Sequence, residues 1–364
     1  MPSGLLNLNK PSGITSRQAV DVVQRLARPA KAGHAGTLDP LAAGVLVVCV
    51  GAATRLIEYV QRMPKGYCAA FLLGRHSPTE DIEGEVTELP NPPVPTLDQL
   101  VAASRRFVGR IQQRPPAFSA LKVEGRRAYQ LARRGDKLEL QARPIEIHRI
   151  EVARYEYPEL ALEVECGSGT YIRSLGRDLA ESLGTAAVMS ALVRTFIGGF
   201  RLDEAVDPWQ LTRENWETCL SPPLRAVEYL PRVQLSAEEV VRVRNGLTIE
   251  VQGSGFRVQG SGARDSVPLA ASPESPLPSR LSTLDSPLCS GFARNDADRV
   301  RRGGPRRPTG RHPRPARARP IPPAPQSAAV GRTSPSGAVE AGVVQPLRRI
   351  LLVNKIASAP TALK

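Results

Sequence analysis

The chain has 364 residues, of which 41% are hydrophobic, and a formal net charge of +14. This length predicts two or three domains, and no apolar run approaches the roughly 18 residues of a membrane span. The N-terminus also lacks the basic region and apolar core of a signal peptide, so we expect a cytoplasmic protein that does not bind membranes. The five cysteines are far apart and do not cluster with the four histidines, which argues against a disulfide framework and a zinc site.

The positive charge is distributed unevenly. Segment 252–327 is rich in Pro, Ser and Gly and holds 13 arginines against five acidic residues, so +8 of the +14 lies there. Such a segment buries too little apolar surface to order itself, and we predict a disordered insertion. The rest of the chain is only mildly basic, which supports a nucleic-acid partner weakly.

In the first part of the chain, apolar patterns predict strands and helices in turn. Thr15 or Ser16 can cap the first helix, and the polar segment 75–84 predicts turns. The first helix has an apolar face that runs from Ala19 to Ala27. The expected strands lie at 5–8, 45–50 and 67–73, and the later helices are expected at 52–62 and 97–108.

Further along, segment 114–135 is expected to end in a helix that carries Arg126, Arg127, Arg133 and Arg134. Segment 138–166 alternates and predicts two antiparallel strands, and 171–183 predicts a helix. Strands and helices mix without strict βαβ alternation. We therefore predict an α+β fold for residues 1–230, with a mainly antiparallel mixed sheet flanked by helices. Segment 231–251 predicts a short helix, a turn at Asn245-Gly246 and a strand.

A loop of small residues surrounds one acid. Residues 32–44 read AGHAGTLDPLAAG, and Asp39 is their only carboxylate. Glycines and alanines let a large ligand approach the backbone closely, and Pro40 biases Asp39 away from helical dihedrals. Asp39 is thus a plausible catalytic group. On these residues alone, however, a simple turn closed or capped by Asp39 is the favoured interpretation.

Four sequence blocks together resemble the bacterial TruB family of tRNA pseudouridine synthases. They are AGHAGTLDPLAAG, KGY at 65–67, SALK at 119–122 and GTYIRSL at 169–175, in the family's order and at its approximate spacing. The resemblance covers about residues 4–230. It implies isomerisation of uridine to pseudouridine at position 55 in the T-loop of tRNA, without a metal or redox cofactor.

The resemblance also assigns roles to single residues. Asp39 matches the family's essential aspartate, and Arg173 matches the arginine that keeps this carboxylate ionised. Tyr67 matches the tyrosine that stacks on the base, once the uridine has flipped out of its loop. His34 matches the histidine that helps to displace the base. Without the family, Arg173 is a surface arginine, Tyr67 a core tyrosine and His34 a turn residue.

Three further residues are expected near the site. Lys122 matches the basic residue of SALK, Leu192 matches a leucine of another active-site block, and Tyr171 packs the wall of the site. Without the family, Lys122 is a solvated lysine, and Leu192 and Tyr171 are core residues. The sequence departs from the family pattern at Phe118, in loop 76–81 and at the Val193-Arg194 pair, and the second departure puts the contacts of that loop in doubt.

The C-terminal part is expected to bind RNA. Segments 231–251 and 328–364 look like two parts of a PUA-type module that the insertion 252–327 interrupts; a coding artefact would also account for this insertion. The expected partner is the T-arm of tRNA, with a monomeric enzyme and no obligatory protein partner.

Three other functions compete with this hypothesis. One is the relative of archaea and eukaryotes that is guided by small RNAs and carries extra N-terminal sequence; this chain begins four residues before its first motif, which favours the stand-alone enzyme. Another is a non-catalytic RNA-binding or tRNA-folding protein of the same fold. The third, a hydrolase that uses Asp39 with a second acid, lacks a second carboxylate in a similar loop.

Overall fold

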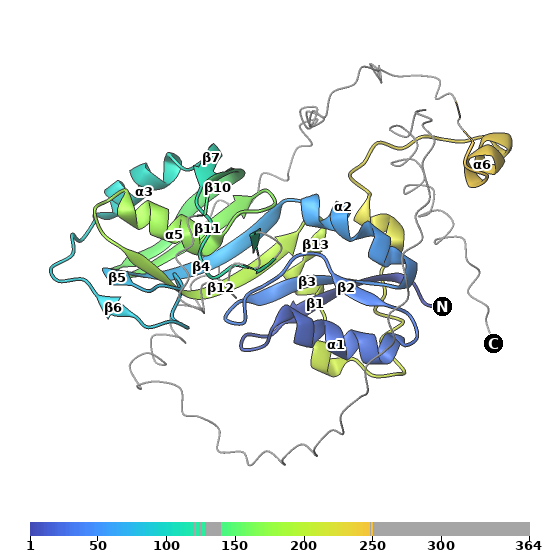
Figure 1. Ribbon diagram of the computed structural model, residues 1–364, viewed down its shortest axis with the longest axis horizontal. Helices are drawn as coiled ribbons and strands as arrows, with labels where there is room; N and C mark the ends of the chain where they lie inside the picture. The colour runs from blue at the N-terminus through green and yellow to red at the C-terminus, as the bar shows by residue number, and fades with distance from the viewer. Residues whose placement is uncertain (120, 124–125, 128–139, 248, 250–364) are drawn as a thin grey trace, which may run out of the picture.

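A nine-stranded mixed sheet forms the centre of the protein (Figure 1). The computed structural model describes residues 1–119, 121–123, 126–127, 140–247 and 249, so the segments 252–327 and 328–364 lie outside the described residues. The main path of the sheet runs β1-β3-β12-β4-β11-β10-β7, with β2 paired to β3 and β13 paired to β12. Its strands are β1 (Gly4–Lys10), β2 (Ala32–His34), β3 (Ala43–Val50), β4 (Lys65–Leu73), β7 (Gly109–Gln113), β10 (Arg143–Glu156), β11 (Glu159–Cys166), β12 (Ala187–Ile197) and β13 (Phe200–Arg201).

The pairing in this sheet is antiparallel except where β12 runs parallel to β3, with Val193 opposite Ala43 and Arg194 opposite Gly44. This confirms the predicted mixed, mainly antiparallel sheet. Two further ladders are short: β5 (Arg75–His76) pairs with β6 (Thr87–Glu88), and β8 (Lys122–Val123) pairs with β9 (Arg126–Arg127).

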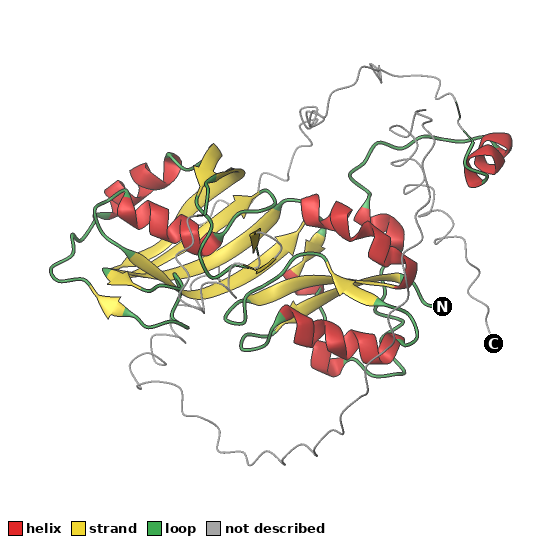
Figure 2. Cartoon of the chain, viewed as in Figure 1, coloured by secondary structure: helices red, strands yellow, loops and turns green. Residues whose placement is uncertain are grey.

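Helices flank the sheet as predicted (Figure 2). They are α1 (Ser16–Ala27), α2 (Ile57–Arg62), α3 (Leu97–Arg105) and α5 (Ile172–Glu181), whereas α6 (Ala237–Arg244) stands apart from the sheet (Figure 1). Thr15 caps α1, because its hydroxyl accepts the Gln18 N–H while the Gln18 side chain accepts the Thr15 N–H. None of the described helices is long and apolar enough to cross a membrane.

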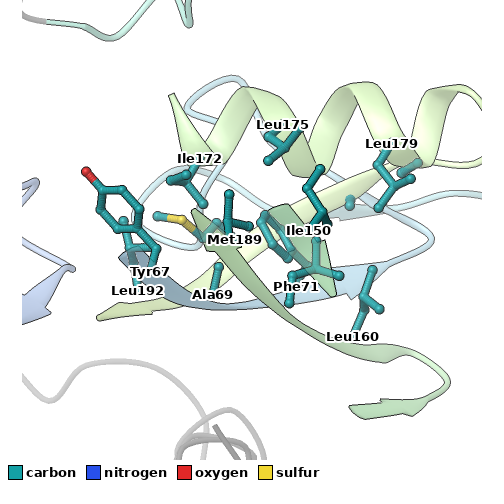
Figure 3. Close-up of a cluster of buried hydrophobic side chains, with 14 of the residues drawn as sticks. Tyr67, Ala69, Phe71, Ile150, Leu160, Ile172, Leu175, Leu179, Met189 and Leu192 are labelled. Atoms are coloured by element: carbon teal, nitrogen blue, oxygen red, sulfur yellow. The ribbon is translucent and has the colours of Figure 1, made fainter. Parts of the chain in front are cut away.

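Three apolar clusters explain the sequence pattern. One packs α3 and α5 against β4, β10, β11 and β12, with Tyr67 at its edge and the Tyr67 hydroxyl directed away from the other labelled side chains (Figure 3). The other two cover opposite faces of β1 and β3: Leu6 and Leu46 face α1, whereas Val45 and Val47 pack with the segment that leads into α2. Because β3 is buried on both faces, its sequence is a continuous apolar run.

Two predicted helices differ from the structure. Segment 52–62 begins as a 3-10 helix, η1 (Gly51–Leu56), before α2. Arg126 and Arg127 belong to strand β9, not to a helix, because Arg127 pairs with Lys122 and Arg126 with Val123; this ladder uses backbone groups that a helix would need. Residues 128–139 of that predicted helix lie outside the described residues. The predicted turn at Asn245-Gly246 follows α6, and the strand expected after it is outside the described part.

Candidate active site

A cavity of about 370 Å³ opens beside Asp39. Its volume falls in the range of about 300–1,000 Å³ that is usual for small-ligand sites. Its walls come from the loop that carries Asp39, the loop between β11 and α5 with the start of α5, the strands β4 and β12, Gln61 of α2, and Ser119 and Leu121 after β7. The residues that line it include Gly36, Thr37, Leu38, Asp39, Lys65, Tyr67, Ser119, Thr170, Tyr171, Arg173, Leu192 and Arg194.

The loop that carries Asp39 is fixed by hydrogen bonds on both sides of the acid. The Ser16 hydroxyl donates to the Leu38 carbonyl (2.9 Å) and accepts the Leu38 N–H (2.8 Å). After the acid, the Gly13 N–H donates to the Pro40 carbonyl at 2.8 Å. The Asp39 side chain itself is 38% exposed. A rigid backbone therefore presents a carboxylate that solvent and ligands can reach.

Arg194 on β12 supports this loop from below and is 1% exposed. Its Nε donates to the Val45 carbonyl at 2.7 Å and its Nη2 to the Gly36 carbonyl at 3.1 Å. Gly44 lets the backbone of Arg194 lie close to β3: a Cβ at Gly44 would lie 2.2 Å from the Arg194 carbonyl oxygen, and the φ of +101° also favours glycine. The small residues around Asp39 thus allow the close approach of Arg194, a residue of the protein itself.

Lys10 at the end of β1 is a second buried cation under the loop. Its Nζ donates to the carbonyls of Pro11 (2.9 Å), Ile14 (2.7 Å) and Pro40 (3.4 Å). Burial lowers the pKa of Lys10 to about 8, while the negative charge of Asp39 opposes that shift. Sequence reasoning missed this residue, because a lysine at a strand end is usually solvated.

Arg173 in the first turn of α5 connects Asp39 with a second carboxylate. Its Nε lies 3.1 Å from Asp39 Oδ2 and its Nη1 lies 3.2 Å from Asp81 Oδ2. The same guanidinium donates to the carbonyls of Thr79 (2.6 Å) and Phe118 (3.0 Å). The side chain is 6% exposed. The structure therefore pairs Arg173 with Asp39, as the resemblance implied, and adds Asp81 as its more buried partner.

The 76–81 loop, which departs from the family pattern, contacts Arg173 through Thr79 and Asp81. Asp81 is 4% exposed, and its Oδ1 accepts hydrogen bonds from the Thr79 hydroxyl (2.6 Å) and the Glu83 N–H (3.1 Å). Its other oxygen faces Arg173. The departures from the family pattern at 76–78 therefore do not remove Thr79 and Asp81, the two residues of this loop that contact Arg173.

Tyr67, Leu192 and Tyr171 all line the cavity. Tyr67 is 8% exposed; burial raises the pKa of its hydroxyl, and a hydrogen bond with Arg194 opposes this rise. Leu192 is buried beside Tyr67 (Figure 3). The backbone of Tyr171 is held by Gln113, whose amide group accepts the Tyr171 N–H at 2.9 Å and donates to the Tyr171 carbonyl at 3.0 Å.

His34 and Lys122 are the two remaining predicted residues. His34 lies on β2 opposite Val48 and is not among the described residues that line the cavity. Lys122 belongs to β8, and its role stays a prediction. Lys65, by contrast, lines the cavity from the KGY block, where its Nζ donates to the carbonyls of Gln61 and Met63 at 2.7 Å. Burial lowers the pKa of Lys65 to about 8.

Comparisons with known proteins identify the family of this chain. Residues 24–172 match the family described as TruB family pseudouridylate synthase, N-terminal domain. The chain is 41% identical over 261 residues to "tRNA pseudouridine synthase B" of Moorella thermoacetica, with 69% of this chain and 84% of that protein covered. It is 40% identical over 284 residues to the protein of the same name from Arthrobacter sp., with 76% and 92% covered.

Solved structures give a similar result. A chain of a Cbf5-Nop10-Gar1 complex matches with a TM-score of 0.52 and 30% identity, over 67% of each chain. A chain of an archaeal box H/ACA sRNP Nop10-Cbf5 complex matches with a TM-score of 0.51 and 27% identity, over 68% of each chain.

Proposed function

Because this chain belongs to the TruB family of pseudouridylate synthases, we propose that the cavity beside Asp39 is the site where it converts uridine in tRNA to pseudouridine. The chain is an isomerase of tRNA, as its relatives are named. We assign its target to position 55 in the T-loop, in line with the family resemblance. One observation carries the assignment of the site: a reachable carboxylate, Asp39, is held by a buried arginine at the mouth of a nucleoside-sized cavity.

The reaction moves the base without changing its composition. The bond between N1 of uracil and C1′ of the ribose breaks, the base turns over, and C5 bonds to C1′; the proton on C5 is lost and N1 gains one. Asp39 serves this step as an ionised carboxylate, whether it attacks the sugar carbon or removes a sugar proton. Arg173, 3.1 Å from Asp39, stabilises that ionised form.

The cavity walls suit a flipped base. Extruding a nucleotide costs a few kcal/mol, and stacking on an aromatic ring returns roughly 1–3 kcal/mol. We assign this stacking to Tyr67, which lines the cavity together with Leu192 and Tyr171. His34, which lies on β2 ahead of the Asp39 loop, is assigned to the RNA outside the cavity, where it fills the space that the flipped base leaves. Lys122 is assigned to the edge of the site.

The C-terminal region is assigned to RNA binding. Residues 1–230 form the catalytic domain, and 231–251 and 328–364 form a PUA-like module around the segment 252–327. We propose that the enzyme acts in the cytoplasm as a monomer without an obligatory protein partner. Similarity to Cbf5 in its complexes favours one alternative, a guide-RNA-dependent enzyme. The higher identity to bacterial proteins named tRNA pseudouridine synthase B supports the first assignment.

The test replaces Asp39 with asparagine, which keeps the shape of the side chain and removes its charge. Purified wild type should form pseudouridine in unmodified tRNA without added protein or RNA, as read by chemical mapping of each uridine. Asp39→Asn should bind the same tRNA with an unchanged Kd and form no pseudouridine. Mass spectrometry must first exclude deamidation back to aspartate. Turnover by the variant within about tenfold of wild type, far less than nucleophile loss produces, removes Asp39 from the chemistry.

A further inference from the structure

A second buried ion pair, between Glu80 and Arg177, lies next to the contacts of Arg173. Glu80 follows Thr79 in the 76–81 loop and has a φ of +63°, a backbone conformation that residues other than glycine rarely adopt. Its Oε2 accepts the Ser174 hydroxyl at 2.7 Å, and its Oε1 pairs with Nη1 of Arg177. Both side chains of the pair are 12% exposed. The loop is therefore tied to α5 at a strained residue.

Arg177 joins this loop to a third segment. Its Nη2 donates to the Arg114 carbonyl at 2.9 Å, just after β7. Its Nε and Nη2 also contact Asp178 Oδ1, at 2.9 and 2.7 Å. One guanidinium thus connects the 76–81 loop, helix α5 and the chain that leaves β7.

These same three segments hold Arg173. The loop supplies the Thr79 carbonyl and the Asp81 carboxylate, and the chain after β7 supplies the Phe118 carbonyl. Arg173 and Arg177 are four residues apart on α5, so they lie on one face of the helix. Arg177, one turn after Arg173, therefore connects the same three segments that position Arg173, and we call these three connected segments the frame. The distance from Asp39 to Arg173 depends on this frame.

We propose that Glu80 and Arg177 are positioning residues for the isomerisation: they fix the frame in which Arg173 aligns Asp39. This inference rests on the proposed function of the Asp39 site. Neither residue lines the described cavity, so their effect passes through Arg173. Loss of the pair lets Glu80 leave its strained conformation, and the Thr79 carbonyl next to it then moves away from Arg173.

The two partners are not equivalent. Glu80 has Ser174 and Arg177 as partners, whereas Arg177 also retains Asp178 and the Arg114 carbonyl. Burial raises the pKa of Glu80, and the charge of Arg177 opposes this rise. Removing Arg177 leaves a buried carboxylate without its cation, which is more harmful than replacing that carboxylate by an amide.

The experiment measures single-turnover rates with saturating enzyme and, separately, tRNA affinity. Arg177→Met should lower the rate at least about tenfold, because a small misplacement of catalytic groups has large effects, with tRNA Kd unchanged. Glu80→Gln should lower it less. The double variant Glu80→Gln/Arg177→Met should be faster than Arg177→Met alone, and Arg177→Lys should recover part of the rate.

The matched control is Arg154→Met, which removes a half-buried arginine that pairs with Glu156 on β10 and Glu159 on β11. Arg154 is opposite Ala161, toward the end of β11 that is remote from Gly167. The single-turnover rate of Arg154→Met should therefore equal that of wild type. All assays run well below each variant's Tm. If Arg177→Met does not fold, Glu80→Gln and Arg177→Lys still decide. Wild-type rates in these variants, or a loss confined to tRNA affinity, overturn the positioning role. A wild-type protein that forms no pseudouridine instead refutes the proposed function.

Discussion

Replacing Arg173 with alanine should affect stability and activity through two different carboxylates. Asp81, 4% exposed, loses the cation that its Oδ2 faces at 3.2 Å, and the carbonyls of Thr79 and Phe118 lose their donor. Asp39, 38% exposed, keeps access to solvent. Stability should therefore fall because of Asp81, whereas activity should fall because of Asp39.

The structure sets the size of the effect. Removing one partner of a buried ion pair costs about 3–5 kcal/mol, whereas the pair with the more exposed Asp39 contributes up to about 1 kcal/mol. For a domain of about 150–250 residues, each kcal/mol shifts Tm by about 2–4 °C. Arg173→Ala should thus lower Tm by roughly 6–20 °C and abolish isomerisation.

A set of three variants separates the two effects. Asp81→Asn alone should lose less stability than Arg173→Ala, because Arg173 keeps Asp39 and both carbonyls. The double variant Arg173→Ala/Asp81→Asn should unfold at a higher temperature than Arg173→Ala and remain inactive. Thermal unfolding and single-turnover assays on the same preparations measure both. A double variant as unstable as the sum of its single variants would refute the pairing, and full activity of Arg173→Ala would refute its support of Asp39.

Three more outcomes are expected. Gly44→Ala should destabilise the protein in urea by more than about 1 kcal/mol and clearly more than Gly13→Ala, since both glycines have positive φ but only Gly44 faces Arg194 within 4 Å; equal losses would contradict the crowding. Burial lowers the pKa of Lys10 from 10.5 to about 8, so between pH 8 and 10.5 the unfolded chain holds a proton that the folded chain has released, and the free energy of unfolding rises with pH in this window. The stability of wild type relative to Lys10→Met should therefore be higher at pH 9.5 than at pH 7, and a constant difference would contradict the shift. Replacing segment 252–327 with a Gly/Ser linker should weaken tRNA binding at low salt and flatten its salt dependence, whose slope is roughly 0.7–0.9 per phosphate contact; it should leave saturated single-turnover rates unchanged, and a slower chemical step would contradict the assignment to RNA binding.

Local patterns in the sequence predicted the elements that local forces decide. The continuous apolar run of β3 and the capped, amphipathic α1 were found because burial periodicity and capping are visible within one element. Asp39, Tyr67 and Arg173 came from matching motifs, and the structure brings all three to one cavity. Periodicity did not predict β9, because its pairing with β8 replaces the expected helix.

Other site residues had no local signal. Arg194 binds the Val45 carbonyl from 149 positions away, and Lys10 reaches Pro40 across 30 positions. Each is a single basic residue, and such residues are mostly exposed; only the folded arrangement buries these two. The same holds for the Glu80 and Arg177 pair, which are 97 positions apart.

Three buried cations around the site are held by hydrogen bonds to backbone carbonyls, and this explains the charge of the site. In the described part of the chain, Lys10, Lys65 and Arg194 donate to backbone carbonyls and form no ion pair with a carboxylate. Carbonyl dipoles satisfy the donors without cancelling the positive charge. Lys65 and Arg194 line the cavity together with Arg173, and Asp39 is the only carboxylate among the described residues that line it. The described lining therefore carries more positive than negative charge, which attracts a phosphate-bearing nucleotide. Arg194, which holds the Asp39 loop through the Val45 and Gly36 carbonyls, thus also favours binding of the substrate.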